Sequence, residues 1–427
     1  MAEQCIVVAE SPSALIKLCG ISVLERLLRI LQRCGFKRAT VLSSTPEAIA
    51  KELSKPSWAR AELDVTIRAR PTGAVTVNQL VDLWPDNAEL LLIVPANSVF
   101  DQRLLRSLIS SSKPAALVDS AVPAQLHSLV GSSPATTRGK LCGPALLKRD
   151  WAMSRTGPLE EALRAGLEDE NLRAVDAADE PLYYAPLNRN LRAYWFPAPS
   201  PENTKLAKRI LLDSAQKGTL DFPAMIHSRI ETFLVSKLCQ TSITPNQLTV
   251  LTNLVAWSAT ILFATGRLGW GLALALIVGV LDGLDGKQAR VKVETTRHGK
   301  LEHSFDALFE VSWWTALGYY FQTSGQLTDG YRYPVLLLLA VGFDAIVKSG
   351  VRSATGKSIE ELGAFERLLH FISARRNIFV WLLAVGFLLG APAKAFIVIT
   401  WWAVITAILH LPRAIAVFSQ SRKLTRS

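Results

Sequence analysis

The sequence predicts an α/β domain in the N-terminal half of the chain, followed by an all-α domain of six transmembrane helices. Up to about residue 225 the charges are scattered, and the apolar runs have only the lengths of strands or ordinary helices. From Leu248 onward the apolar stretches approach or reach the roughly 20 residues that a helix needs to cross a bilayer. The 427 residues are enough for more than one domain.

The N-terminal domain is predicted from alternating strand and helix patterns. CIVVAE is typical of a buried strand, ISVLERLLRILQRCGF of an amphipathic helix, and KRATVLSS of a second strand. The strand and helix recur in AELLLIVPANSVF and DQRLLRSLIS. Repeated βα units favour a mostly parallel sheet, so we expect an α/β domain over residues 1–197.

Residues 198–246 are predicted to link the two domains. PENTKLAKRILLDSAQK has the pattern of a helix, closed by Gly218. HSRIETFLVSKLCQ predicts a second helix whose apolar residues share one face, namely Ile230, Phe233, Leu234 and Leu238. A helix of this kind beside a membrane span is expected to lie at the membrane surface.

The C-terminal domain, residues 247–427, contains the apolar segments. They predict six spans, at approximately 247–265, 268–284, 303–322, 333–350, 377–390 and 395–417. Basic residues concentrate in the loops after the second and fourth spans and in the tail, which predicts that these parts and the N-terminal domain lie on the cytosolic side of the cytoplasmic membrane. The net charge of +11 therefore indicates contact with anionic lipid or phosphate, and no nucleic-acid-binding motif is present.

The cysteines and the N-terminus bear on the compartment. The 5 cysteines are odd in number, widely spaced and without a CxxC pair, which favours reduced cytosolic thiols over disulfides or a zinc site. MAEQCIVVAE lacks the basic and long apolar regions of a signal peptide.

Acidic residues at the second and third spans are candidates for chemistry. Asp282 and Asp285 are three positions apart and Glu302 and Asp306 four apart, so each pair shares a helix face. Carboxylates gathered at membrane depth repel one another and are costly to desolvate. Mg²⁺ or Mn²⁺, completed by a substrate pyrophosphate, would compensate them and polarise a phosphoryl group. A remaining carboxylate could accept the proton of an attacking hydroxyl.

Small and basic residues accompany these acids. Gly283, Gly286 and Ala289 would let a nucleotide approach the helix backbone. Arg290 could donate charge-assisted hydrogen bonds to phosphate.

The acidic segment resembles the signature of the CDP-alcohol phosphatidyltransferase family, D-x2-D-G-x2-A-R followed by G-x3-D-x3-D. The first part is matched by Asp282, Asp285, Gly286, Ala289 and Arg290. In the second part Gly299 matches, but His303 and Ala307 occupy the aspartate positions. Removing one loop residue from the alignment gives these two roles to Glu302 and Asp306, and EHSFDAL then resembles DHGCDAL of eukaryotic choline and ethanolamine phosphotransferases.

This resemblance implies roles for individual residues. Asp282, Asp285, Glu302 and Asp306 would hold the metal, and Asp306 would also be the catalytic base. The segment SITPNQLT resembles the S/T-P-N-x-x-T element of the family, which adds Asn246 and Thr249 to the residues that bind the cytidine diphosphate. The implied reaction transfers a phosphoalcohol group from CDP-diacylglycerol or a CDP-polyol to an alcohol acceptor and releases CMP. The family also implies a homodimer.

Further polar and aromatic residues in or beside the spans have structural or functional interpretations. Arg375 and Arg376 would grip an acceptor phosphate or anchor the fifth span at the interface, and His303 is a third candidate for acceptor binding. Asp344 and Lys348, four positions apart, are predicted to form a structural ion pair. The pairs Trp313-Trp314 and Trp401-Trp402 are typical of interfacial belts or of packing between spans.

The whole chain resembles archaeal bifunctional inositol-1-phosphate cytidylyltransferase and di-myo-inositol phosphate phosphate synthase proteins. This implies a Rossmann-like, nucleotidyltransferase-like N-terminal domain. The Gly-rich loop of such enzymes is replaced by VAESPSA, a metal-binding aspartate by the neutral Asn97, and a later aspartate by FPAP. We therefore expect a catalytically inactive domain that is kept as a scaffold, a dimerisation surface or a nucleotide sensor.

Two hypotheses follow for the chain. The first is a membrane CDP-alcohol phosphotransferase in phospholipid or phosphopolyol biosynthesis. The second is a catalytically inactive membrane scaffold or nucleotide-sensing regulator, for which the replacements at His303 and Ala307 are the best support.

Overall fold

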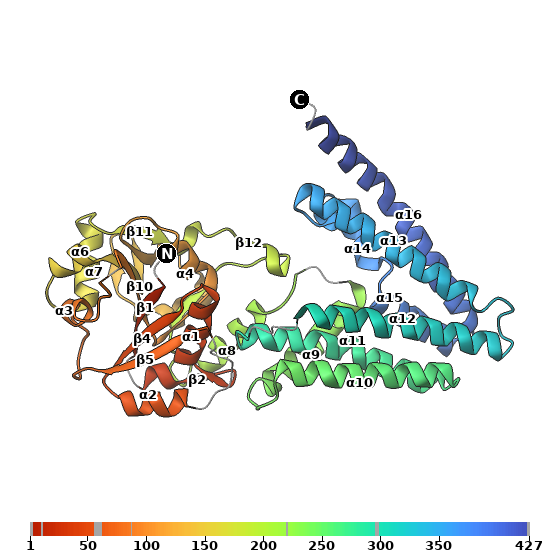
Figure 1. Ribbon diagram of the computed structural model, residues 1–427, viewed down its shortest axis with the longest axis horizontal. Coiled ribbons are helices and arrows are strands. Elements are labelled where there is room, and N and C mark those ends of the chain that lie inside the picture. The colour runs from red at the N-terminus through yellow and green to blue at the C-terminus, as the bar shows by residue number, and fades with distance from the viewer. Residues whose placement is uncertain are drawn as a thin grey trace. The chain divides into compact units, whose positions relative to one another are not determined.

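The chain forms two compact units in a computed structural model (Figure 1). The first comprises Met1–Gly218, Leu238–Ser242 and Arg290–Glu294, and the second comprises Thr219–Lys237, Ile243–Ala289 and Thr295–Ser427. The structure describes residues 3–9, 12–54, 62–86, 88–218, 221–294 and 299–424, without the side chains of 299–304 and 420–424.

A largely parallel sheet forms the centre of the first unit. Its strand order is β11-β8-β10-β6-β1-β4-β5, with β9 paired to β10. Parallel pairs join β1 to β4, β1 to β6, β4 to β5 and β8 to β11, whereas β10 runs antiparallel to its neighbours. The strands are β1 (Gln4–Ala9), β4 (Arg38–Ser43), β5 (Asp64–Ala69), β6 (Leu90–Pro95), β8 (Ala115–Asp119), β9 (Ala135–Thr136), β10 (Gly139–Lys148) and β11 (Arg173–Asp176). The predicted α/β class is confirmed.

The predicted βαβ unit is present as β1, α1 (Val23–Arg33) and β4. Ser22 ends the preceding strand and caps α1, because its side chain accepts a hydrogen bond of 3.1 Å from the amide of Glu25. The other α-helices described in the first unit are α2 (Pro46–Leu53), α3 (Val77–Val81), α4 (Gln102–Ile109), α5 (His127–Val130), α6 (Arg149–Met153), α7 (Leu159–Glu168) and α8 (Thr204–Ser214). The core between the sheet and these helices is apolar, with Ile6, Leu91, Ile93, Val118 and Leu147 buried together.

The first unit also holds a short segment from much later in the chain, Arg290–Glu294. Arg26 of α1 donates a hydrogen bond of 2.6 Å to the carbonyl of Val291, and Arg29 donates one of 2.7 Å to that of Lys292. Both guanidinium groups are almost completely buried. The arginines of α1 therefore fix the main chain of this segment.

The second unit is all helix. Each predicted span falls on a helix of α10 (Pro245–Ala264), α11 (Leu268–Val291), α12 (Gly299–Thr323), α13 (Arg332–Thr355), α15 (Arg376–Leu388) or α16 (Pro392–Leu424). Among the described residues, α10, α11, α13 and α16 are long and apolar enough to cross a membrane. A bent pair, α14 (Ala364–Ile372) and α15, adds a fifth span if the two form one. The count of six is not confirmed, because α15 alone has 13 residues and α12 carries acidic side chains in its first turns.

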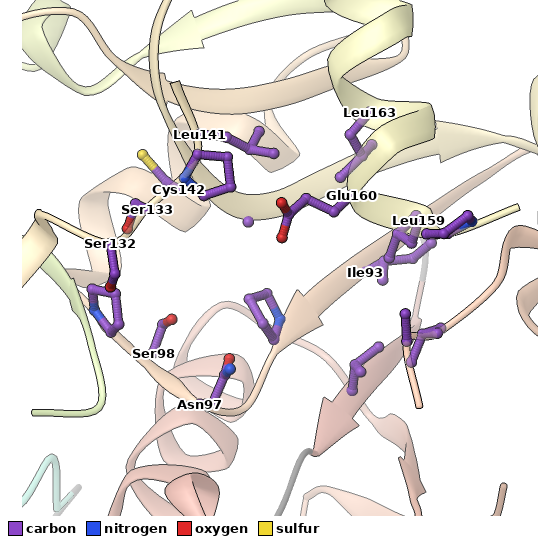
Figure 2. A pocket seen from close by; sticks show the side chains of 18 of the residues that line it. Ile93, Asn97, Ser98, Ser132, Ser133, Leu141, Cys142, Leu159, Glu160 and Leu163 are labelled. Atoms are coloured by element: carbon purple, nitrogen blue, oxygen red, sulfur yellow. The ribbon is translucent and has the colours of Figure 1, made fainter. Parts of the chain in front are cut away.

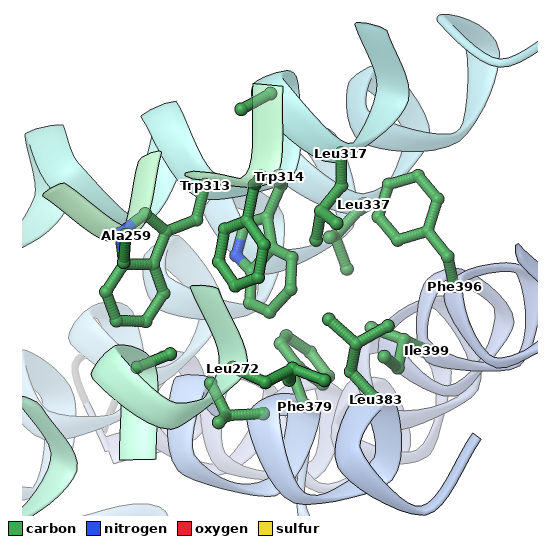
Figure 3. Packing of buried hydrophobic residues seen from close by; sticks show 14 of the residues in the cluster. Ala259, Leu272, Trp313, Trp314, Leu317, Leu337, Phe379, Leu383, Phe396 and Ile399 are labelled. Atoms are coloured by element: carbon green, nitrogen blue, oxygen red, sulfur yellow. The ribbon is translucent and has the colours of Figure 1, made fainter. Parts of the chain in front are cut away.

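Aromatic side chains fill the core of the helical unit (Figure 3). Trp313 and Trp314 of α12 are buried against residues of α10, α13, α15 and α16, including Ala259, Leu337, Phe379 and Phe396. The indole N–H of Trp313 donates a hydrogen bond of 2.8 Å to the carbonyl of Ala256. This pair therefore packs between helices, whereas Trp401 is 49% exposed.

A buried charge cluster joins α13 to α16. Asp344 pairs with Lys348 at 2.7 Å, which confirms the predicted structural ion pair. His410 of α16 contacts the other oxygen of Asp344 at 2.6 Å. Local sequence patterns did not predict this third member, because 66 positions separate it from Asp344.

Helix α9 (Phe222–Leu238) exposes several apolar side chains and buries two polar ones, although Val235 is also buried and Arg229 is exposed. Ile230 is 44% exposed and Phe233 62%, while His227 and Glu231 are buried. An exposed apolar face is expected on a helix that contacts lipid. This distribution supports the interpretation of a helix at the membrane surface.

Candidate active site in the helical unit

Asp285 of α11 is buried and held by two donors. It accepts a hydrogen bond of 2.7 Å from the hydroxyl of Thr249 and one of 2.5 Å from the amide of Gly286. Thr249 belongs to the first turns of α10, which starts with a capping box between Thr244 and Gln247 and with Pro245 in the first turn. The segment TPNQLT thus fixes the start of α10 in a register that points Thr249 at Asp285.

Asp282, one turn earlier on α11, pairs with an arginine from a different helix. The distance from its Oδ2 to a terminal nitrogen of Arg376 is 2.5 Å. Arg376 opens α15, and its guanidinium also lies 5.0 Å above the centre of the Phe309 ring. The pair is largely shielded from solvent, with 12% of the arginine side chain exposed.

Asp306 lies on α12 and faces the same region. The charged groups that act on it are Asp282, Arg376, Asp285 and Glu310. Arg376 is in turn within electrostatic range of Asp282, Glu310 and Asp306. Carboxylates of α11 and α12 therefore share one arginine as a neighbour.

Two predicted residues of α12, Glu302 and His303, have side chains outside the described residues. Among the side chains that the structure does describe, no three His, Cys, Asp or Glu residues are arranged as a metal-binding group. The ligand chemistry nevertheless fits a hard divalent cation. Asp282, Asp285 and Asp306 offer carboxylate oxygens, and together they carry more negative charge than the single positive charge of Arg376 balances.

The remaining residues predicted to bind the nucleotide have varied surroundings. The space beside Gly283 is taken by Glu231 of α9, since an added Cβ would lie 2.3 Å from Oε1 of that carboxylate. Asn246 is exposed in the first turn of α10, and Gly286 and Ala289 are half-buried on α11. Arg290 donates a hydrogen bond of 2.7 Å to the carbonyl of Ala215 within the first unit. Their roles toward a nucleotide stay predictions.

Helix α9 contributes polar residues that the sequence pattern did not single out. His227 packs against Gly279 and Glu231 against Gly283. Lys287 is 1% exposed and donates a hydrogen bond of 2.6 Å to the hydroxyl of Thr232. The spacing of these residues could have predicted their shared location, because His227 and Glu231 are four positions apart on the helix face opposite to the exposed apolar residues.

A separate cavity of about 770 Å³ lies in the first unit. In Figure 2 the carboxylate of Glu160 points into it, with Asn97, Ser98 and Ser133 on its walls. Asn97 is the neutral residue that stands where an aspartate was expected. Among the described lining residues Arg70 is the basic one, and it donates hydrogen bonds to the carbonyls of Pro71 and Gly73.

The contact between Thr249 and Asp285 leads to a prediction. Replacing Thr249 with valine keeps the shape of the side chain but removes the hydroxyl donor to a buried carboxylate. We expect the affinity for the CDP-activated donor that the sequence resemblance implies to fall about tenfold, because a carboxylate without its donor is misoriented. The Michaelis constant for the donor measures this. Thr265→Val, at the other end of α10, should leave it unchanged.

A bundle of apolar helices with carboxylates and an arginine at one partly buried centre defines a membrane-associated domain suited to phosphate chemistry. Residues 242–409 match the family model described as CDP-alcohol phosphatidyltransferase. The match covers the region that holds Asp282, Asp285, Asp306 and Arg376, so this part of the chain is similar to that family of enzymes.

Curated relatives are similar over part of their length. A protein of Aquifex aeolicus (strain VF5) named "Bifunctional IPC transferase and DIPP synthase" is 28% identical over 214 residues, which are 48% of this chain and 47% of the relative. A protein of the same name from Rubrobacter xylanophilus is 30% identical over 209 residues, 48% of this chain and 45% of the relative. The matched part thus spans about half the length of these relatives.

Solved nucleotidyltransferase structures resemble about half of the chain. An inositol-1-phosphate CTP transferase from T. maritima gives a TM-score of 0.34 at 11% identity, covering 49% of this chain and 96% of that one. A UDP-glucose pyrophosphorylase from Acinetobacter baumanii gives 0.34 at 13% identity, covering 49% and 92%. At these values the likeness says nothing about what the first unit binds.

Proposed function

We propose that this protein transfers a phosphoalcohol group from a CDP-activated donor to an alcohol acceptor and releases CMP. The observation that carries the proposal is the arrangement of the family motif. Asp282 and Asp285 of D-x2-D-G-x2-A-R share their electrostatic surroundings with Asp306 of the neighbouring acidic motif. A scaffold without turnover would not require this costly gathering of carboxylates.

In the proposed reaction, the acceptor hydroxyl attacks the phosphorus next to the donor's alcohol. A new phosphorus–oxygen bond forms, the bond to the bridging oxygen of the diphosphate breaks, and CMP leaves with the bonding electrons. Asp306 takes the proton of the attacking hydroxyl. Arg376, which pairs with Asp282 in the structure, would contact phosphate oxygens of the substrate.

Asp282, Asp285, Glu302 and Asp306 are the residues that would hold Mg²⁺ or Mn²⁺. Such an ion would polarise the phosphoryl group and stabilise the leaving phosphate. Thr249 keeps the Asp285 carboxylate oriented for this task through its hydrogen bond.

The names of the curated relatives favour a CDP-polyol over CDP-diacylglycerol as the donor. The helical unit crosses the cytoplasmic membrane six times if α12 and α15 also span, with the first unit and the active site on the cytosolic side. Residues 1–197 are a scaffold without its own turnover, and residues 198–246 link this scaffold to the transmembrane helices. The functional form is a homodimer.

The decisive experiment incubates the purified full-length protein, in lipid nanodiscs, with Mg²⁺ or Mn²⁺. CDP-inositol and CDP-diacylglycerol serve as donors in separate reactions, with inositol 1-phosphate, glycerol 3-phosphate and inositol as acceptors. We expect CMP release that requires both an acceptor and the metal. Absence of CMP with every pair of substrates would favour the inactive scaffold instead.

A further inference from the structure

Two glycines let α9 approach the part of α11 that carries Asp282. A Cβ added to Gly279 would lie 2.8 Å from Cε1 of His227, and one added to Gly283 would lie 2.3 Å from Oε1 of Glu231. Small residues four positions apart allow two helices to pack closely. Helix α9 therefore presents His227 and Glu231 directly to the turns on either side of Asp282.

His227 belongs to a group of polar side chains beside Gly279. Its ring is 4% exposed, and its centroid lies 6.4 Å from that of the Trp381 ring of α15. Asn377, also of α15, places its Oδ1 3.4 Å from the position of a Gly279 Cβ, and Nδ1 of His227 lies 3.3 Å from the same point. An imidazole, an indole N–H and a carboxamide thus lie together between α9, α11 and α15.

Part of the hydrogen-bonding capacity of this group is unused, although the His227 ring has the main chain of Gly279 as a hydrogen-bonding neighbour. Nδ1 of His227 and Nε1 of Trp381 are buried, and neither has a hydrogen-bonding partner of normal geometry among the described residues. A buried polar atom left in this state is costly, and native proteins satisfy nearly all such atoms with protein, water or ligand. A group from outside the chain is therefore expected to bind here.

The location of His227, Trp381 and Asn377 indicates which external group binds there. Asn377 directly follows Arg376, which binds Asp282, and Gly279 lies one turn before Asp282. The charged groups near the His227 ring are Asp221 and Arg376. Asp221 in turn pairs with Arg375 at 3.8 Å. The group therefore lies beside the proposed site of transfer, with Arg376 among its charged neighbours.

We infer that His227, Asn377 and Trp381 form the subsite that binds the hydroxyl groups of the acceptor alcohol. Together they offer both donors and acceptors, which match hydroxyls that are themselves both. The subsite favours an acceptor with several hydroxyl groups over a simple alcohol. This inference rests on the proposed function and identifies residues that select among acceptors.

The test measures steady-state kinetics of His227→Phe with inositol 1-phosphate as the acceptor and CDP-inositol as the donor. We expect the Michaelis constant for the acceptor to rise about tenfold or more, because a site built for hydroxyl groups loses a partner. The Michaelis constant for the donor should change less than about twofold. His227→Gln, which keeps a donor and an acceptor, should recover most of the loss.

His370 supplies a matched control. It is also 4% exposed, and its ring nitrogens also lack hydrogen-bonding partners in the described structure, but it belongs to α14. His370→Phe should leave the acceptor constant unchanged. An equal rise in both variants, or no rise in His227→Phe, would overturn the inference and indicate that bound water alone satisfies the group.

A binding measurement separates this inference from the proposed reaction. Calorimetric titration of inositol 1-phosphate into the protein without donor should show weaker binding to His227→Phe and Trp381→Phe than to the original protein or His370→Phe. If this pattern appears while no donor yields CMP, the subsite stands and the proposed transfer fails. If CMP is released but binding is equal in all variants, the transfer stands and the subsite fails.

Discussion

Replacing Asp306 with asparagine should lower the rate of CMP release about 1,000-fold while the protein stays folded. The change removes the proposed base and one metal ligand but alters neither the size nor the shape of the side chain. It also lowers the repulsion from Asp282, Asp285 and Glu310, so the free energy of unfolding should not fall. CMP release and the thermal midpoint of the same preparation measure both effects.

The control for this variant is Asp329→Asn, which changes an exposed aspartate in the loop before α13. It should retain full activity. Equal rates for the original protein and Asp306→Asn would exclude Asp306 as the base. A large drop in the thermal midpoint would instead show that the aspartate has a structural role.

Replacing Arg376 with glutamine should both destabilise the helical unit and reduce activity about 100-fold. The guanidinium pairs with Asp282 at 2.5 Å and is within electrostatic range of Asp306 and Glu310. Removing one partner of a shielded ion pair leaves the other charge uncompensated, which costs about 3 kcal/mol in the free energy of unfolding. The activity should fall because Asp282 loses its fixed orientation and the phosphate loses a cation.

The neighbouring arginine provides the comparison. Arg375 contacts Asp221 at 3.8 Å, and 41% of its side chain is exposed. Arg375→Gln should therefore change the free energy of unfolding by less than about 1 kcal/mol. Thermal unfolding in nanodiscs distinguishes the two. A stability of Arg376→Gln equal to that of Arg375→Gln would contradict the role assigned to the Asp282 pair.

Local sequence patterns predicted most of the fold because they report what each segment buries. The alternation of strand and helix patterns around CIVVAE and KRATVLSS found the βαβ unit, and the apolar runs found the helices of the second unit. The number of spans could not be settled in the same way. Helix α15 is short and α12 begins with charged residues, so length and hydropathy do not determine whether they cross the membrane.

The residues of the candidate site could be predicted where they lie close together in the sequence. Asp282 and Asp285 were found from their spacing, and Asp306 from the next acidic pair along the chain. Contacts between distant helices were not predictable: the partner of Asp282 is Arg376, 94 positions away, and that of Asp285 is Thr249, 36 positions away. A pattern on one helix does not identify the helix that packs against it.

The same limit applies to His227. Its pattern on α9 separates a polar from an apolar face, and the exposed side is the apolar one. In a soluble protein this pattern would favour a solvent-facing histidine. A lipid surface reverses the preference, and only the packing against Gly279 shows where the ring lies.

The central claim is that Asp282, Asp285 and Asp306 together hold a divalent cation for the donor. Electron paramagnetic resonance of Mn²⁺, titrated into the purified protein with CDP-inositol present, tests it most directly. The account predicts saturable binding that weakens about tenfold or more in Asp282→Asn, Asp285→Asn and Asp306→Asn, and stays unchanged in Asp329→Asn. Mn²⁺ binding of equal strength in all these proteins, or none in any of them, would contradict it.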